Sequence, residues 1–124
     1  MNKNISLLIV ENKYLIAYNF KRELERLGYR VFALASSGKV AIEVARQRKP
    51  DVVLIDMGLD EGASGLDAAR EIASRYKIPI IFVIGQMDHT TLEKMKAIHP
   101  AACLAKPIMG RQIHVAISRH FRAV

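Results

Sequence analysis

Apolar runs alternate with amphipathic stretches along the whole chain of 124 residues. Most of the runs have no polar interruption, which is typical of parallel strands that are covered on both faces. Between the runs, apolar residues recur every three or four positions, as in helices with one buried face. This alternation predicts an α/β fold: a single (βα)5 three-layer sandwich around a parallel five-stranded sheet. The expected strands are Ile5–Val10, Arg30–Leu34, Asp51–Asp56, Pro79–Ile84 and Ala101–Ala105, of which the first, third and fourth look central.

Local signals predict where some helices begin and end. Ser64 with Asp67, and Thr90 with Glu93, have the spacing of capping boxes, in which a hydroxyl and a carboxylate satisfy the first free N–H groups of a helix. Gly28 follows the first helical pattern and is a plausible helix stop. The segment 36–40, Ser-Ser-Gly-Lys-Val, resembles part of a phosphate loop but lacks the earlier glycine and the final hydroxyl. We therefore interpret it as the N-cap of the second helix.

Composition limits the class of protein. The chain is 51% hydrophobic and 25% charged, which is the balance of a globular domain. The single cysteine, Cys103, excludes a disulfide framework and is expected to be an inert core residue within a strand. The sequence shows no signal peptide and no apolar stretch of about 20 residues, so we expect a cytoplasmic protein without a membrane span.

The net charge of +7 is unevenly distributed, because no acidic residue follows Glu93. Three interpretations stay open: a solvated basic face, a surface for an acidic protein partner, and a nucleic-acid surface. Nucleic acid is the least favoured, because Phe121 is the only aromatic residue in the stretch and interleaved aromatics are typical of single-strand binding. The basic side chains are Lys94, Lys96, Lys106, Arg111, Arg119 and Arg122.

Polar residues that can carry chemistry follow three of the expected strands. Glu11 and Asn12 follow the first strand, Asp56 closes the third, and Lys106 follows the fifth. Open parallel sheets place their ligand sites at the carboxyl ends of their strands. The sequence therefore predicts a site for a cation and a phosphoryl group at that edge. No His or Cys pattern predicts a zinc site, and no G-x-G-x-x-G follows the first strand.

Over essentially its whole length, the chain resembles the receiver domain of bacterial two-component response regulators. The resemblance rests on the acidic pair after the first strand, the aspartate that closes the third, and the Lys-Pro that closes the fifth. Further matches are the L-x-x-G-x-x-G loop of Leu59, Gly62 and Gly65, and segments 27–29, 49–53 and 78–82. The resemblance implies a CheY-like, flavodoxin-like fold with strand order 2-1-3-4-5 over residues 1–124.

The resemblance also implies roles for the polar residues. Asp56 would be the phosphoacceptor and a ligand of Mg2+, with the Gly58 carbonyl as a second ligand. Glu11 and Asn12 would hold the rest of the cation shell, and Lys106 would pair with a phosphoryl oxygen. The implied phosphodonor is a sensor histidine kinase or a phosphotransfer protein, and the implied domain is not a turnover enzyme.

Three positions depart from the family pattern. The second residue of the acidic pair is Asn12 where an aspartate is usual, which keeps an oxygen ligand and loses a charge. Ile84 stands where the family carries a threonine or serine that binds the phosphoryl group, and Cys103 stands where an aromatic often moves with that hydroxyl. Loss of both halves of this switch indicates an altered route of activation.

Two interpretations follow from these departures. The domain is phosphorylated on Asp56 and transmits the event through another surface, or it is a degenerate receiver that serves as a phosphorylation-independent docking module. Retention of Asp56, Glu11 and Lys106 favours the first. A metal-dependent hydrolase is a third class, disfavoured because no second nucleophile is expected beside Asp56. The short chain favours either a single-domain regulator or an excised receiver.

Overall fold

The computed structural model describes residues 5–57, 62–86 and 88–122. Within these ranges, no helix is both long enough and apolar enough to cross a membrane. The strands are β1 (Ser6–Val10), β2 (Arg30–Ala35), β3 (Val52–Met57), β4 (Ile80–Ile84) and β5 (Ala102–Ala105). The helices are α1 (Tyr14–Arg26), α2 (Gly38–Arg48), α3 (Gly62–Tyr76), α4 (His89–Lys96) and α5 (Gly110–Arg122).

All five strands form one parallel sheet in the order β2-β1-β3-β4-β5. This confirms the predicted order, and it places β1, β3 and β4 inside the sheet as their unbroken apolar runs predict. Each observed strand boundary lies within one residue of the predicted one. Because every strand is parallel, all five carboxyl ends meet at one edge.

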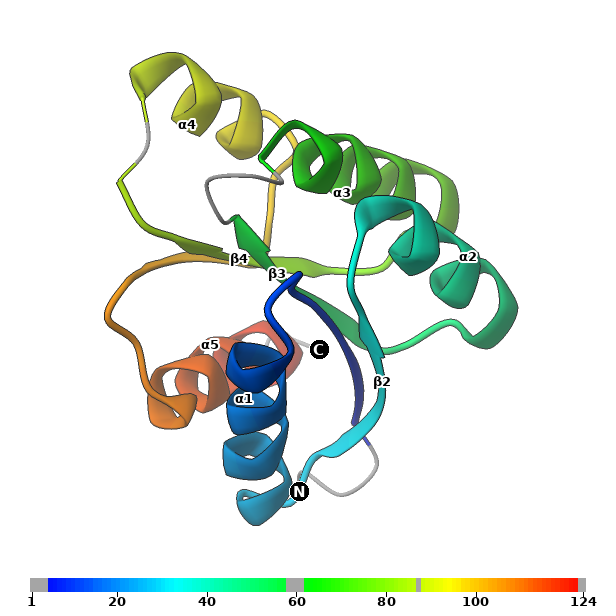
Figure 1. Ribbon diagram of the computed structural model, residues 1–124, viewed down its shortest axis with the longest axis vertical. Helices are drawn as coiled ribbons and strands as arrows, with labels where there is room; N and C mark the ends of the chain where they lie inside the picture. Colours follow the sequence, from blue (N-terminus) through cyan, green and yellow to red (C-terminus); the bar gives the residue numbers. More distant parts are fainter. Residues whose placement is uncertain (1–4, 58–61, 87, 123–124) are drawn as a thin grey trace.

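Helices cover both faces of the sheet, with α2, α3 and α4 on one face and α1 and α5 on the other (Figure 1). Successive side chains of a strand point to opposite faces, so each inner strand supplies both layers of core. Leu8, Ile55 and Phe82 pack in the first layer, whereas Ile9 and Leu54 pack in the second, and all five are fully buried. The fold is the predicted three-layer sandwich.

Two local predictions are confirmed. The Ser37 hydroxyl accepts a hydrogen bond of 3.2 Å from the Val40 N–H, so the segment after β2 caps α2 and is not a phosphate loop. Gly28 has a φ of 100°, a left-handed conformation that glycine adopts without strain, and it ends α1.

The two predicted capping boxes are wrong. Helix α3 begins at Gly62, so Ser64 lies inside its first turn, and α4 begins at His89, so Thr90 lies inside that helix. The cap of α4 is Asp88, whose carboxylate accepts a hydrogen bond of 2.7 Å from the Thr91 N–H. A hydroxyl followed three residues later by an acid marks a cap only if the preceding residues leave the helix. Spacing alone does not decide that.

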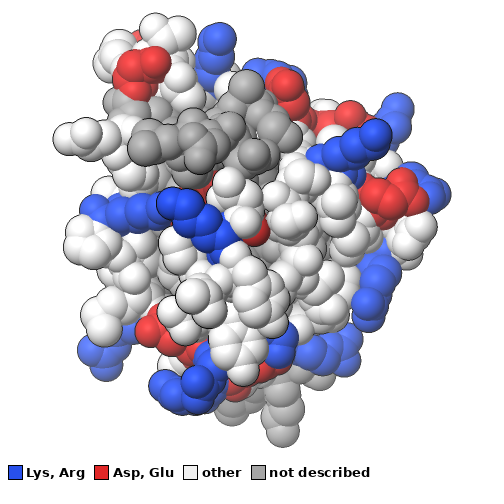
Figure 2. Space-filling view, in the orientation of Figure 1, with Lys and Arg blue, Asp and Glu red and all other residues white. Residues whose placement is uncertain are grey.

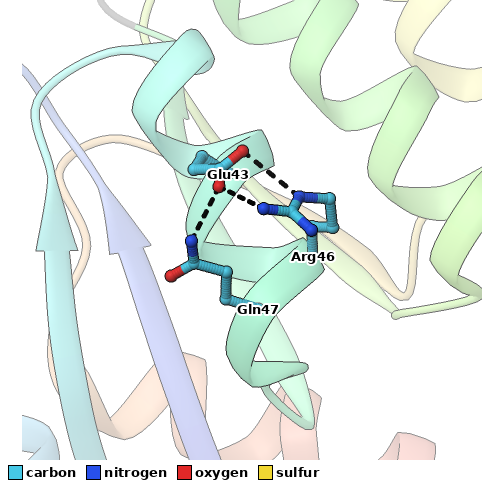
Figure 3. A network of polar contacts seen from close by, with 3 residues as sticks. All are labelled: Glu43, Arg46 and Gln47. Carbon is cyan, nitrogen blue, oxygen red and sulfur yellow. Dashed lines mark hydrogen bonds and ion pairs between the residues drawn. The ribbon is translucent and has the colours of Figure 1, made fainter.

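The outer faces of the helices are held by exposed ion pairs between neighbouring turns. On α2, the Glu43 carboxylate accepts hydrogen bonds from Arg46 and Gln47, and the bond from Arg46 lowers the pKa of Glu43 (Figure 3). Basic and acidic side chains alternate in the same way over α3 (Figure 2). Such exposed pairs contribute only tenths of a kcal/mol each to the free energy of folding. Packing of the core, and not these pairs, therefore positions the carboxyl ends of the strands.

The cap of α4 gives a test that separates the two assignments. We expect Asp88→Ala to lower the free energy of unfolding by about 1 kcal/mol, because the Thr91 N–H loses its acceptor. The matched variant Thr90→Ala should change that free energy by less than about 0.5 kcal/mol. Urea denaturation of both variants measures the difference, and a larger loss in Thr90→Ala would restore the predicted box.

Candidate functional site

The carboxyl ends of three strands bring together the charged residues that the sequence singled out. Asp56 is the last residue but one of β3, Glu11 follows β1, and Lys106 follows β5. Strand β3 lies between β1 and β4, so Asp56 sits at the centre of the edge, and its side chain is only 1% exposed. The structure therefore places these three residues at one edge of the sheet.

An ion pair connects Asp56 with Lys106. The Lys106 ammonium lies 2.9 Å from Oδ1 of Asp56, and its side chain, 37% exposed, reaches the carboxylate from the solvent. The backbone of Lys106 is fixed as well, because its N–H donates a hydrogen bond of 2.7 Å to the carbonyl of Ile84. Neither oxygen of Asp56 accepts a hydrogen bond of good geometry from the described residues. The carboxylate is thus buried and charge-paired but keeps its lone pairs available.

Glu11 is the second buried carboxyl at this edge, and 5% of its surface is exposed. The N–H of Lys13 donates a hydrogen bond of 2.7 Å to Oε2 of Glu11, which orients the side chain. Burial, followed by the nearby Asp56 carboxylate, raises the pKa of Glu11 from 4.5 to about 7, while Lys13 and Lys106 oppose the rise. Because the Asp56 oxygens have no well-formed hydrogen bond, we attribute the influence of Asp56 to proximity of two negative charges.

These residues fit a hard divalent cation. The buried Asp56 carboxylate accepts no well-formed hydrogen bond from the described residues, and the buried Glu11 beside it holds a proton more tightly than usual, so a cation at this edge would be favoured. Mg2+ takes oxygen ligands, keeps several waters and needs only one or two carboxylates. Asn12 is exposed beside Glu11, and Gly58 lies outside the described residues. Among the described residues, this edge included, no group of three or more His, Cys, Asp or Glu side chains could hold a metal ion.

The two atypical positions lie on the strands next to this edge. Ile84 ends β4, in register with Met57 and Ala105, and its half-buried side chain packs against the core under α4. Cys103 of β5 lies beside Phe82 of β4 and packs against the same core layer as Ile84. Burial raises the pKa of the Cys103 thiol. Neither side chain offers a strong hydrogen-bond donor toward an anion.

One contact near the site has no counterpart in the sequence analysis. Oε1 of Glu23 on α1 accepts a hydrogen bond of 2.6 Å from the N–H of Gly110, the first residue of α5. The two residues are 87 positions apart, so no local pattern could have revealed the contact. Gly110 follows Lys106 by four positions, which connects α1 with the segment that carries the lysine.

Exposed apolar side chains lie on α1 immediately after the acidic pair. Tyr14 and Leu15 are 67% and 74% exposed, and Tyr18 stacks on Tyr14 with ring centroids 5.9 Å apart. Three large apolar side chains on one exposed helix turn form a surface that a partner protein can cover.

Comparisons with known proteins agree with this geometry. Residues 7–118 match the family model of the response regulator receiver domain. The chain is 31% identical to the phyllosphere-induced regulator PhyR of Methylorubrum extorquens over 115 residues, which are 91% of this chain and 42% of that protein. It is 32% identical to the transcriptional regulatory protein PdtaR of Mycobacterium tuberculosis over 121 residues, 94% of this chain and 58% of PdtaR. The chain thus spans about half the length of these two relatives.

Solved structures show the same fold. The signal receiver domain of a modulated diguanylate cyclase from Desulfovibrio desulfuricans G20 superposes with a TM-score of 0.84 at 32% identity, covering 92% of this chain and 90% of that one. A CheY-like receiver domain protein from Methanospirillum hungatei JF-1 gives a TM-score of 0.85 at 19% identity, covering 96% and 94%, and supports the fold alone. The chain belongs to the response regulator receiver domain family of two-component signalling.

The raised pKa of Glu11 predicts how stability depends on pH in metal-free solution. The folded protein holds this proton more tightly than the unfolded chain, so the stabilisation is complete below pH 4.5 and is lost as the pH rises through about 7. We expect a loss on the order of 2 kcal/mol, after allowance for solvent screening at the mouth of the site. Urea denaturation in the presence of a chelator measures it. Glu11→Gln, which has no titrating group there, should not show this loss, and equal pH profiles for the two proteins would contradict the assignment.

Proposed function

We propose that this receiver accepts a phosphoryl group on Asp56 from a histidine kinase or a phosphotransfer protein, in a reaction that depends on Mg2+, and then signals through protein contacts. The observation that carries the proposal is the buried Asp56 carboxylate, which is paired with Lys106 at 2.9 Å and accepts no well-formed hydrogen bond from the described residues. A carboxylate held in this way is a nucleophile whose lone pairs are not engaged elsewhere.

The remaining residues of the edge have matching tasks. Glu11 and Asp56 would hold the cation, together with Asn12 and the Gly58 carbonyl, and the cation would neutralise charge on the carboxylate and on the incoming phosphoryl group. An oxygen of Asp56 would form the new bond to phosphorus as the bond between phosphorus and the donor nitrogen breaks. Lys106 would move its ion pair from Asp56 to a phosphoryl oxygen, as a flexible point charge can do.

The surface suggests where partners bind. The exposed patch of Tyr14, Leu15 and Tyr18 follows the acidic pair directly, so a phosphodonor protein that covered it would bring its phosphoryl group to Asp56. The exposed basic residues of α4 and α5, among them Lys94 and Arg119, would meet an acidic protein target. A nucleic-acid partner remains disfavoured, and the cytoplasmic location remains a prediction.

A second candidate is a phosphorylation-independent docking module. The observations that favour it are the missing charge at Asn12 and the two apolar packing positions, Ile84 and Cys103, which offer the phosphoryl group no strong donor. Against it, a pure docking domain gains nothing from a buried carboxylate pair that costs free energy to desolvate.

Intact mass spectrometry separates the two candidates. After incubation with Mg2+ and acetyl phosphate, we expect a mass increase of one phosphoryl group that is absent in Asp56→Asn and reduced without Mg2+. An unchanged mass in the wild-type protein, with a known receiver phosphorylated in parallel, would favour the docking module.

The charge at position 12 should set the affinity for Mg2+. We expect Asn12→Asp to tighten Mg2+ binding by about 1–3 kcal/mol, roughly one to two factors of ten in the dissociation constant, because the cation gains a charged ligand. Glu11→Gln should weaken it. Calorimetric titration measures all three proteins, and equal affinities would rule out this ligand set.

A further inference from the structure

We propose that Glu23 is a positioning residue of the phosphorylation site, which acts by holding the segment that carries Lys106. The inference rests on the function proposed above, and it adds a residue of α1 that touches neither the carboxylates nor a phosphoryl group. Its basis is the hydrogen bond of 2.6 Å from the Gly110 N–H to Oε1 of Glu23.

The segment between β5 and α5 is short and fixed at both ends. Only residues 107–109 separate Lys106 from Gly110. At one end, the Lys106 N–H donates to the carbonyl of Ile84 at 2.7 Å, and at the other the Gly110 N–H donates to Glu23. Three residues between two fixed points have few conformations, so the start of α5 limits how far the backbone after Lys106 can shift.

Glu23 supplies a negative charge that α5 lacks. The first turn of α5 contains no acidic residue, although the free N–H groups at a helix start favour an anion. Within the segment itself, the Met109 N–H donates to Oε1 of the neutral Gln112 at 2.8 Å. The charged acceptor therefore comes from α1, on the same face of the sheet (Figure 1).

The approach of the two helices is possible because residue 110 is glycine. A Cβ atom at this position would lie 2.9 Å from both Cβ and Oε1 of Glu23, closer than side chains tolerate. The backbone of α5 at Gly110 thus contacts the carboxylate of Glu23 on α1 directly, so the two helices have little freedom to shift relative to one another.

The position of the Lys106 backbone matters because it sets how far the ammonium group can reach. The Lys106 side chain is 37% exposed, and within the described residues its ammonium pairs only with Asp56. A displacement of about 1 Å in a charge that must meet a developing phosphoryl oxygen can slow a reaction substantially. Releasing Glu23 would allow such a displacement while leaving Glu11 and Asp56 in place.

The first experiment compares Glu23→Ala with the matched control Glu25→Ala on the same helix, whose carboxylate, among the described residues, pairs only with Lys21. We expect Glu23→Ala to slow phosphorylation by acetyl phosphate at saturating Mg2+ on the order of three- to tenfold. The Mg2+ dissociation constant should stay within about twofold of wild type in both variants, because the cation ligands are untouched. Glu23→Gln, whose amide oxygen still accepts, should recover part of the rate, and Gly110→Ala should slow the reaction by separating the helices.

A double-mutant cycle decides whether Glu23 acts through Lys106. If it does, Glu23→Ala causes no further slowing in a Lys106→Ala background. The same slowing factor in both backgrounds would overturn the proposal, because it would show a general structural effect. An unchanged rate in Glu23→Ala would overturn it as well.

A readout that needs no phosphorylation separates this inference from the proposed function. The NMR signal of the Lys106 ammonium in the unmodified protein should shift in Glu23→Ala and remain in place in Glu25→Ala. If the wild-type protein accepts no phosphoryl group, the proposed function fails, and this shift still shows whether Glu23 positions Lys106. A Lys106 signal that is the same in all variants would reject the positioning role.

Discussion

The burial of the Asp56 carboxylate is the constraint on which the functional edge depends. A charge that is 1% exposed has lost most of its hydration, and a folded protein tolerates this only if a counter-charge lies close. Lys106 provides that charge at 2.9 Å. For this pairing, Lys106 after β5 reaches Asp56 of β3 across β4, and the parallel order places both at the same edge of the sheet. The central strand therefore carries the buried carboxylate, and the edge strand brings the lysine that pairs with it.

A single lysine does not balance two buried carboxyls. Burial, and after it the nearby Asp56 carboxylate, raises the pKa of Glu11 to about 7. Asn12 has the same effect on the total charge, since an aspartate there would add a third carboxylate. Both features reduce repulsion in the metal-free protein and weaken the attraction for a cation. A change at this edge that stabilises the metal-free protein would therefore lower its affinity for a cation.

Ile84 and Cys103, the two atypical positions, affect which parts of the fold make polar contacts toward the Asp56 edge. Ile84 and Cys103 pack against the core layer that contains Met95 of α4, so on this side of the sheet neither side chain gives the Asp56 carboxylate a polar contact. On the opposite face, the backbone after Lys106 leads to Gly110 and through it to Glu23 on α1. The polar contacts after Lys106 therefore run toward α1 and α5.

The sequence by itself determined the strands, their parallel arrangement and the edge where Glu11, Asp56 and Lys106 meet. These follow from the spacing of hydrophobic residues, which depends only on neighbouring positions. They also follow from the general rule that the carboxyl ends of parallel strands share one edge of the sheet. The tertiary structure alone decided where α3 begins, which residue caps α4, the raised pKa of Glu11 and the contact between Glu23 and Gly110. Each of these depends on burial or on groups far apart in the chain. A local sequence pattern does not indicate which distant side chains will bury a carboxyl group or accept a hydrogen bond from a free N–H.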